Sequence, residues 1–325
     1  MNSPDSSLDS DLQHDRTGNF PDQILGLPCR LLVCAGGEAA VTQQGAQVIS
    51  WRDAQGKERF YLSAQTRGAK RDELEATAMA SDAIRGGIPI SFPQFSVRGP
   101  LLKHGFIRLQ KWACAPEQRI ADKAAASAPH QHEQASLTLQ VSDDEQSRAI
   151  WPQAFDAELK VELERNCLRT TLSITNRSEQ PWAFTTALHS YLQVDDILQT
   201  ELAGLQHTRY QDATANNTEI VDQAERLTIA GEVDRVYMAP PATLHLLEKN
   251  IPTLRIQHEG FSDTVVWNPG PELARNLTDF PDQDWKRMLC VEAACAATPV
   301  VLQPGQTWRG AQILTALVDG AAARQ

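Results

Sequence analysis

The sequence predicts an all-β protein built as a large antiparallel β-sandwich, and two observations lead to this prediction. Apolar and polar residues alternate with a period of two in several segments, whereas helical periodicity is scarce. Strand-like segments also occur along the whole length, without helices regularly placed between them. We therefore expect antiparallel sheets with one buried face and not alternating βαβ units.

The clearest element is a β-hairpin over residues 156–178. Alternating runs cover Leu159–Leu163 and Leu168–Ile174, and the dipeptide Arg165-Asn166 separates them. Further strands are expected where the same pattern returns, in SLTLQVSD from Ser136, TLRIQHE from Thr253, DTVVWN from Asp263 and TWRGAQILTAL from Thr307. The only good helical pattern is a short one from Lys70 to Ile84.

Two polar segments frame the expected domain organisation. The first nineteen residues are rich in Ser and Asp, which predicts a disordered tail, and residues 20–325 are expected to form a single domain. Residues 121–135 are rich in Ala, Ser and Gln and predict an exposed loop. We interpret His130 and His132 in this loop as solvated side chains and not as metal ligands.

Charge and composition exclude several classes of partner. The chain has 30 Lys and Arg against 41 Asp and Glu, a net charge of −11, so a polyanionic nucleic acid or membrane would be repelled. No run approaches the roughly 20 apolar residues of a membrane-spanning helix, and no signal peptide is evident, which predicts a cytoplasmic protein. Six cysteines are then expected as reduced thiols.

Two cysteine pairs share a C-x4-C spacing that could hold a metal. They are Cys29 with Cys34 and Cys290 with Cys295, but no His or Cys cluster in the sequence completes either pair. We therefore expect small buried hydrophobic residues at these positions and no metal site.

A basic segment stands out in this acidic chain. From Ala83 through Pro116 there is no Asp or Glu, and the positive charges there are Arg85, Arg98, Lys103, Arg108 and Lys111. These side chains could form an anion site, or they could be solvated groups on a strand and its loops.

The sequence around the basic residues favours the anion site. In RGGIPISFPQF two glycines and then two prolines follow Arg85, so the backbone there is both permissive and constrained. The glycine pattern is not that of a nucleotide-binding loop. In KHGFIR, Lys103, His104 and Arg108 lie close together, and Lys and Arg are natural phosphate ligands.

Two further residues are candidates for acid–base chemistry. His189 lies in the apolar, aromatic segment FTTALHSYLQVDDI, and Glu292 lies in an apolar run from Met288 to Val301. A strand histidine is often a satisfied core residue, and alternation leaves open whether Glu292 faces solvent or a site.

Six segments in this order resemble the hexose-6-phosphate mutarotases of the aldose 1-epimerase superfamily. They are RGGIPISFPQF, KHGFIR, ALHSYLQVDDI, EVDRVY, DTVVWNPG and KRMLCVEAA, spanning about residues 84–294. The resemblance implies a galactose-mutarotase-like β-supersandwich, with no cofactor and no metal. It implies His189 and Glu292 as catalytic residues, and Arg85, Lys103, His104, Arg108 and Asp234 as contacts to substrate.

Three positions depart from the family pattern. Ser96 replaces a common Gly, Leu102 a common Pro, and Gly270 a common Trp. None is the implied acid or base, so the departures concern the shape of the sugar pocket and substrate preference.

The implied function is glucose-6-phosphate 1-epimerase, an isomerase that interconverts the α and β anomers of a hexose 6-phosphate. Glu292, ionised at neutral pH, takes the proton of the anomeric hydroxyl while protonated His189 gives one to the ring oxygen, and the two exchange roles on ring closure. A small hexose 6-phosphate is the expected partner, and a monomer the expected state.

Three other functions compete with this interpretation. An aldose 1-epimerase acting on unphosphorylated sugars would keep the same acid and base, but the basic segment speaks against it. A non-catalytic sugar-binding β-sandwich would use aromatic residues such as Trp267 for stacking and would need no acid–base pair. A glycosidase would need two carboxylates at the bond.

Overall fold

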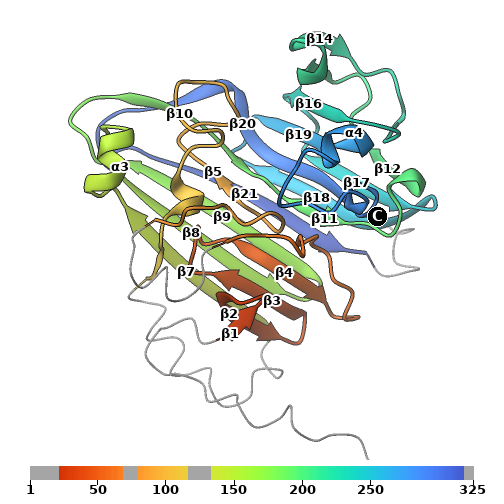
Figure 1. The fold of residues 1–325 in the computed structure, drawn as a ribbon, viewed down its shortest axis with the longest axis horizontal. Helices are drawn as coiled ribbons and strands as arrows, with labels where there is room; N and C mark the ends of the chain where they lie inside the picture. Colours follow the sequence, from red (N-terminus) through yellow and green to blue (C-terminus); the bar gives the residue numbers. More distant parts are fainter. Residues whose placement is uncertain (1–21, 69–78, 116–132, 318–325) are drawn as a thin grey trace, which may run out of the picture.

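The structure, a computed structural model, describes residues 22–68, 79–115 and 133–317, and arranges them mainly as antiparallel strands in three sheets (Figure 1). A four-stranded sheet near the N-terminus has the order β1-β2-β3-β4. Its strands are β1 (Asp22–Ile24), β2 (Leu27–Cys34), β3 (Gly37–Thr42) and β4 (Val48–Asp53).

A nine-stranded sheet forms one large layer of the molecule (Figure 1). Its strands in spatial order are β15 (Arg226–Thr228), β12 (Thr200–Ala203), β17 (Thr243–Glu248), β18 (Ile251–Glu259), β21 (Thr307–Ala316), β9 (Cys167–Asn176), β8 (Phe155–Glu164), β7 (Gln134–Ser142) and β6 (Ala113–Cys114). The N-terminal sheet packs against this layer, because β2 and β3 contact β7 and β8.

An eight-stranded sheet carries the residues most relevant to function. Its order is β14 (Thr218–Val221), β13 (Arg209–Asp212), β16 (Val233–Met238), β19 (Asp263–Asn268), β20 (Met288–Leu302), β10 (Trp182–Leu188) and β5 (Ile90–Ser91), with β11 (Tyr191–Gln193) also paired to β20. The described helices are short: α3 (Glu145–Ile150), α4 (Gly270–Ala274) and the 3₁₀ turns η1 (Ile107–Leu109), η3 (Ile197–Gln199), η4 (Ala213–Ala215) and η5 (Asp284–Arg287).

The predicted hairpin is confirmed as β8 and β9. Leu163 is paired with Leu168, and every second residue of β8 from Phe155 to Leu163 is buried. Asn166 in the turn has a φ of 58°, a left-handed conformation that Asn tolerates better than most residues. The other four predicted strands are confirmed as β7, β18, β19 and β21.

Some predictions fall outside the described residues. The tail over residues 1–19, most of the helix from Lys70 to Ile84 and most of the loop over residues 121–135 lie there. Residues 79–84 are described and are not helical, and strand β7 already begins at Gln134, so those ends of the two predictions are wrong. The single domain from residue 20 onward stays a prediction.

A hydrophobic core joins the sheets. One buried cluster includes Trp51 of β4, Phe155 of β8 and Val291 of β20, which come from three different sheets. The polar side chain of Gln312 on β21 crosses between layers: it accepts a hydrogen bond from Ser190 and donates one to the Val291 carbonyl. These two hydrogen bonds hold Ser190 and Val291, the chain neighbours of His189 and Glu292.

No helix in the described part of the chain is both long and apolar enough to cross a membrane.

Candidate active site

A cavity of about 560 Å³ lies beside the eight-stranded sheet, and all the site residues predicted from the sequence line it. They are Arg85, Lys103, His104, Arg108, His189, Asp234 and Glu292. These residues span more than two hundred positions of the sequence, so the sheet topology brings them together. The volume lies within the range of about 300–1,000 Å³ that is usual for small-molecule pockets.

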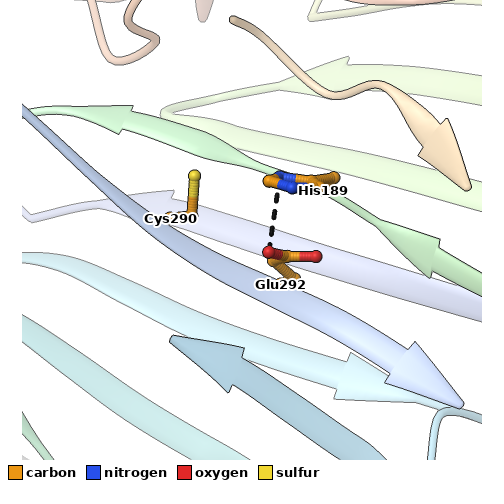
Figure 2. A group of neighbouring side chains, drawn as sticks. All are labelled: His189, Cys290 and Glu292. Carbon is orange, nitrogen blue, oxygen red and sulfur yellow. Dashed lines mark ion pairs between the residues drawn. The ribbon is translucent and has the colours of Figure 1, made fainter. Parts of the chain in front are cut away.

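His189 and Glu292 face each other across neighbouring strands (Figure 2). His189 lies in the break between β10 and β11, where its N–H donates to the Pro89 carbonyl and leaves the regular strand pairing. Glu292 lies in β20, opposite Val265 of β19. The imidazole Nδ1 is 3.3 Å from the carboxylate Oε1, and His189 and Glu292 are only 8% and 1% exposed.

Burial changes the protonation that the sequence suggests for this pair. Desolvation, together with the negative charge of Asp234, raises the pKa of Glu292 well above its usual range. Desolvation, together with the positive charges of Arg85 and Arg108, lowers the pKa of His189 well below its usual range. Burial therefore favours a neutral imidazole beside a protonated carboxyl, whereas an ionised Glu292 is expected from the sequence.

Aromatic rings fix the orientation of the His189 imidazole. Tyr191 stacks on it with ring centroids 4.8 Å apart and planes inclined by 10°, and Trp267 meets it edge-on at 6.2 Å. His104 also meets it edge-on, at 5.1 Å. An imidazole packed on three sides is held in place for directed proton transfer.

The tautomer of His104 follows from its hydrogen bonds. The Ser96 backbone N–H donates to Nδ1 at 3.3 Å, and the Ser91 hydroxyl lies 2.9 Å from the same atom. A backbone N–H cannot accept, so Nδ1 is the acceptor and neutral His104 carries its proton on Nε2. Burial, together with the positive charges of Arg108 and Lys103, lowers the pKa of His104, which favours this neutral form.

Arg85 is held rigidly at the cavity wall. Its Nε and Nη2 donate to the two carboxylate oxygens of Asp279 at 3.1 and 3.0 Å, and its Nη1 donates to the Tyr191 hydroxyl at 3.2 Å. Gly87 has a φ of 59°, and a Cβ there would collide with the carbonyl oxygen of Val48. The RGGIP sequence thus makes the close backbone packing that positions this guanidinium.

Arg108 is a partly buried cation without a carboxylate partner among the described residues. The Nη2 of Arg108 donates to the Lys103 carbonyl at 2.7 Å, while the Nε of Arg108 has no hydrogen-bond partner among the described residues. Burial lowers the pKa of this guanidinium, because the charge loses hydration without gaining an ion pair. An anion entering the cavity would supply the missing partner.

The basic segment divides between the cavity and the rest of the surface. Arg85, Lys103 and Arg108 line the cavity, whereas Arg98 and Lys111 do not. Arg98 instead donates to Gln211 and Asn217, side chains of the region around β13 and β14. Only Arg85, Lys103 and Arg108 of this segment can therefore contribute to an anion site in this cavity.

Asp234 of β16 adds a carboxylate to the cavity lining. It is paired in register with Trp267 of β19, and burial raises the pKa of its carboxyl. Glu232, two residues earlier, also lines the cavity. The cavity thus combines carboxylates, which can accept hydrogen bonds from sugar hydroxyls, with cations that can bind an anion.

Several residues of the cavity wall could not be predicted from the sequence. Asp279, which holds Arg85, is separated from it by 194 positions, and Arg67 adds another guanidinium to the cavity wall. No local pattern marks either residue. The four cysteines of the C-x4-C pairs are buried, as expected, and the two of β20 have different surroundings: Cys290 lies beside His189 and Glu292, while the Cys295 thiol contacts the Gly260 carbonyl.

The chain thus combines a β-sandwich with a cavity that is lined by a buried imidazole and a buried carboxylate. It belongs to the aldose 1-epimerase family, whose family model matches residues 31–315. It is therefore an epimerase, a class of isomerase.

Comparisons with individual proteins agree with this family. A protein of Cenchrus ciliaris with the provisional name glucose-6-phosphate 1-epimerase is 32% identical over 86% of this chain and 81% of its own. A protein of Escherichia coli strain K12 with the same provisional name is 28% identical over 80% of each chain. The crystal structure of a provisionally assigned mutarotase from Salmonella typhimurium superimposes with a TM-score of 0.75 at 27% identity, covering 90% of this chain and 91% of that one.

Proposed function

We propose that this epimerase interconverts the α and β anomers of hexose 6-phosphates, with His189 and Glu292 as its acid–base pair. The observation that carries the phosphate part is the partly buried Arg108, which lies in the cavity lining with Arg85 and Lys103 and has no carboxylate partner among the described residues. Burying a cation without a partner is costly, and a substrate phosphate would remove that cost. The provisional names of the relatives point to the same substrate class.

The chemistry requires one proton to leave the anomeric hydroxyl and another to reach the ring oxygen. In the productive form Glu292 is a carboxylate that accepts the first proton, and His189 is an imidazolium that donates the second. The ring opens to an aldehyde, which rotates about the C1–C2 bond. Glu292 then returns its proton to the carbonyl oxygen as the ring oxygen attacks C1 and gives its proton to His189.

The pair holds one proton at every stage of this cycle, and only its position changes. The neutral pair favoured by burial is also the state present while the open-chain aldehyde is bound. The phosphate adds negative charge next to Arg85 and Arg108, the two cations that lower the pKa of His189. Substrate binding therefore favours the imidazolium that starts ring opening.

This account predicts the protonation state of His189 in the free enzyme. Because its pKa is lowered, the imidazole should be neutral at pH 7 and should gain a proton only below its ordinary pKa of 6.5. Saturating inorganic phosphate should shift that titration to higher pH. Nitrogen-15 NMR of labelled imidazoles, assigned with the variant His189→Asn, measures both; an imidazolium at pH 7 without phosphate would contradict the account.

Anomer exchange measured by NMR tests the proposed function without a coupling enzyme. Saturation transfer between the two anomers should show catalysis for glucose 6-phosphate, galactose 6-phosphate or mannose 6-phosphate, and much weaker catalysis for free glucose. An enzyme that prefers free glucose would instead be an aldose 1-epimerase for unphosphorylated sugars. A protein that binds sugar without accelerating exchange would be a non-catalytic sandwich.

A further inference from the structure

Cys290 places a third metal-ligating group next to the proposed acid–base pair (Figure 2). Cys290 and Glu292 are two residues apart on β20, so their side chains lie on the same face of the sheet. His189 reaches them from the break between β10 and β11. One ligand atom from each residue lies within 4.8 Å of the other two, and all three residues are buried.

The geometry of the group is close to that of a tetrahedral metal site. Zinc bonds of about 2.0–2.3 Å to nitrogen, oxygen and sulfur place neighbouring ligand atoms roughly 3.3–3.6 Å apart. The separation between His189 Nδ1 and Glu292 Oε1 is already 3.3 Å. The thiol needs to approach by at most about 1.5 Å, which a side-chain rotation can provide.

Two polar atoms of these side chains also lack hydrogen-bond partners. They are His189 Nδ1 and Glu292 Oε2, which are both buried and have no hydrogen bond among the described residues. Such atoms are costly to bury unless another group satisfies them. His189 and Glu292 line the cavity, so a metal ion held here would keep a fourth coordination position open towards it.

We propose that His189, Cys290 and Glu292 form a binding site for a thiophilic divalent cation such as Zn²⁺, and that the cation competes with the sugar. The donor set of one nitrogen, one sulfur and one oxygen suits Zn²⁺ and disfavours Mg²⁺ and Ca²⁺, which prefer oxygen alone. On binding, the thiol proton and any proton on the carboxyl are released to solvent, and the negative charges of the thiolate and the carboxylate balance the cation.

The competition part rests on the proposed function, whereas the binding part does not. A bound Zn²⁺ would occupy the lone pairs with which Glu292 and His189 move protons. It would therefore abolish anomer exchange while leaving the cavity cations Arg85, Lys103 and Arg108 unchanged. The site would act as an inhibitory one and would supply no step of the reaction.

Binding is tested with Co²⁺, a spectroscopic substitute for Zn²⁺. Protein freed of metals with EDTA should show a thiolate-to-cobalt charge-transfer band when Co²⁺ is added. Adding Zn²⁺ should displace the Co²⁺ and remove the band. The band should disappear in Cys290→Ser and persist in Cys295→Ser, a matched cysteine of the same strand. Absence of the band in the natural protein, or its persistence in Cys290→Ser, would overturn the site.

A second variant covers the case in which Cys290→Ser does not fold. His189→Asn removes the nitrogen ligand, so it should weaken Co²⁺ binding by at least about 10- to 100-fold, as removing a ligand or its support generally does. Unchanged affinity in this variant would also overturn the site. Calorimetric titration with Zn²⁺ gives the affinities independently of any catalysis.

Inhibition tests whether metal and sugar compete. Zn²⁺ should raise the KM for glucose 6-phosphate, and EDTA should reverse this effect. In Cys290→Ser the inhibition constant for Zn²⁺ should rise at least about tenfold, when inhibition is measured against that variant's own metal-free rate. Equal inhibition of Cys290→Ser and Cys295→Ser would overturn the competition. If the metal-free protein exchanged no sugar at all, the proposed function would fail while the cobalt spectrum would still decide the site.

Discussion

Glu292→Gln is expected to reduce kcat/KM for anomer exchange of glucose 6-phosphate by about 10²–10⁴-fold, the usual contribution of one positioned proton-transfer group. The amide is nearly the same size as the carboxyl but can no longer accept and return the anomeric proton. His189→Asn is expected to have a loss of the same order. Exchange NMR on purified variants measures both effects.

A matched control separates lost chemistry from lost packing. Glu248 is another buried carboxylate, but it pairs with Lys57 at 3.0 Å and does not line the cavity. Glu248→Gln should therefore keep the exchange rate even if its melting temperature falls. Turnover of Glu292→Gln or His189→Asn at the level of the natural protein would show that the acid–base assignment is wrong.

Arg108→Ala is expected to raise the KM for glucose 6-phosphate by about 10- to 100-fold, because charge-assisted hydrogen bonds contribute roughly 1.5–3 kcal/mol each. The KM for free glucose should change little, since that sugar offers no phosphate to the guanidinium. Exchange rates measured over a range of both sugar concentrations give the two constants.

Arg98→Ala is the control for this prediction. It removes a guanidinium from the same acid-free segment, but Arg98 donates to Gln211 and Asn217 and does not line the cavity. It should leave both Michaelis constants almost unchanged. Equal increases for the phosphorylated and the free sugar in Arg108→Ala would argue against a phosphate role.

Much of the fold was predictable because it depends on local patterns. The hairpin of β8 and β9 follows from alternation and one turn, and strands β7, β18, β19 and β21 follow from the same period. Which strands become neighbours was not predictable in this way. The pairing of β20 with both β10 and β19 joins segments far apart in sequence, and no local period encodes it.

The candidate site was predictable only through family motifs. Alternation alone could not decide whether Glu292 faces solvent, and in the structure both faces of β20 are covered around it. The shifted pKa values depend on burial and on distant charges such as Arg85, so they required coordinates. Asp279 could not be linked to Arg85 because their contact spans 194 positions.

The central claim is that one cavity combines a proton-transfer pair with a phosphate site. Exchange NMR on the natural protein tests it most directly, by comparing kcat/KM for glucose 6-phosphate and for glucose under identical conditions. We expect the phosphorylated sugar to be favoured by about 10²-fold or more, since at least two charge-assisted contacts are gained. No acceleration of either sugar, or equal values for both, would contradict the claim.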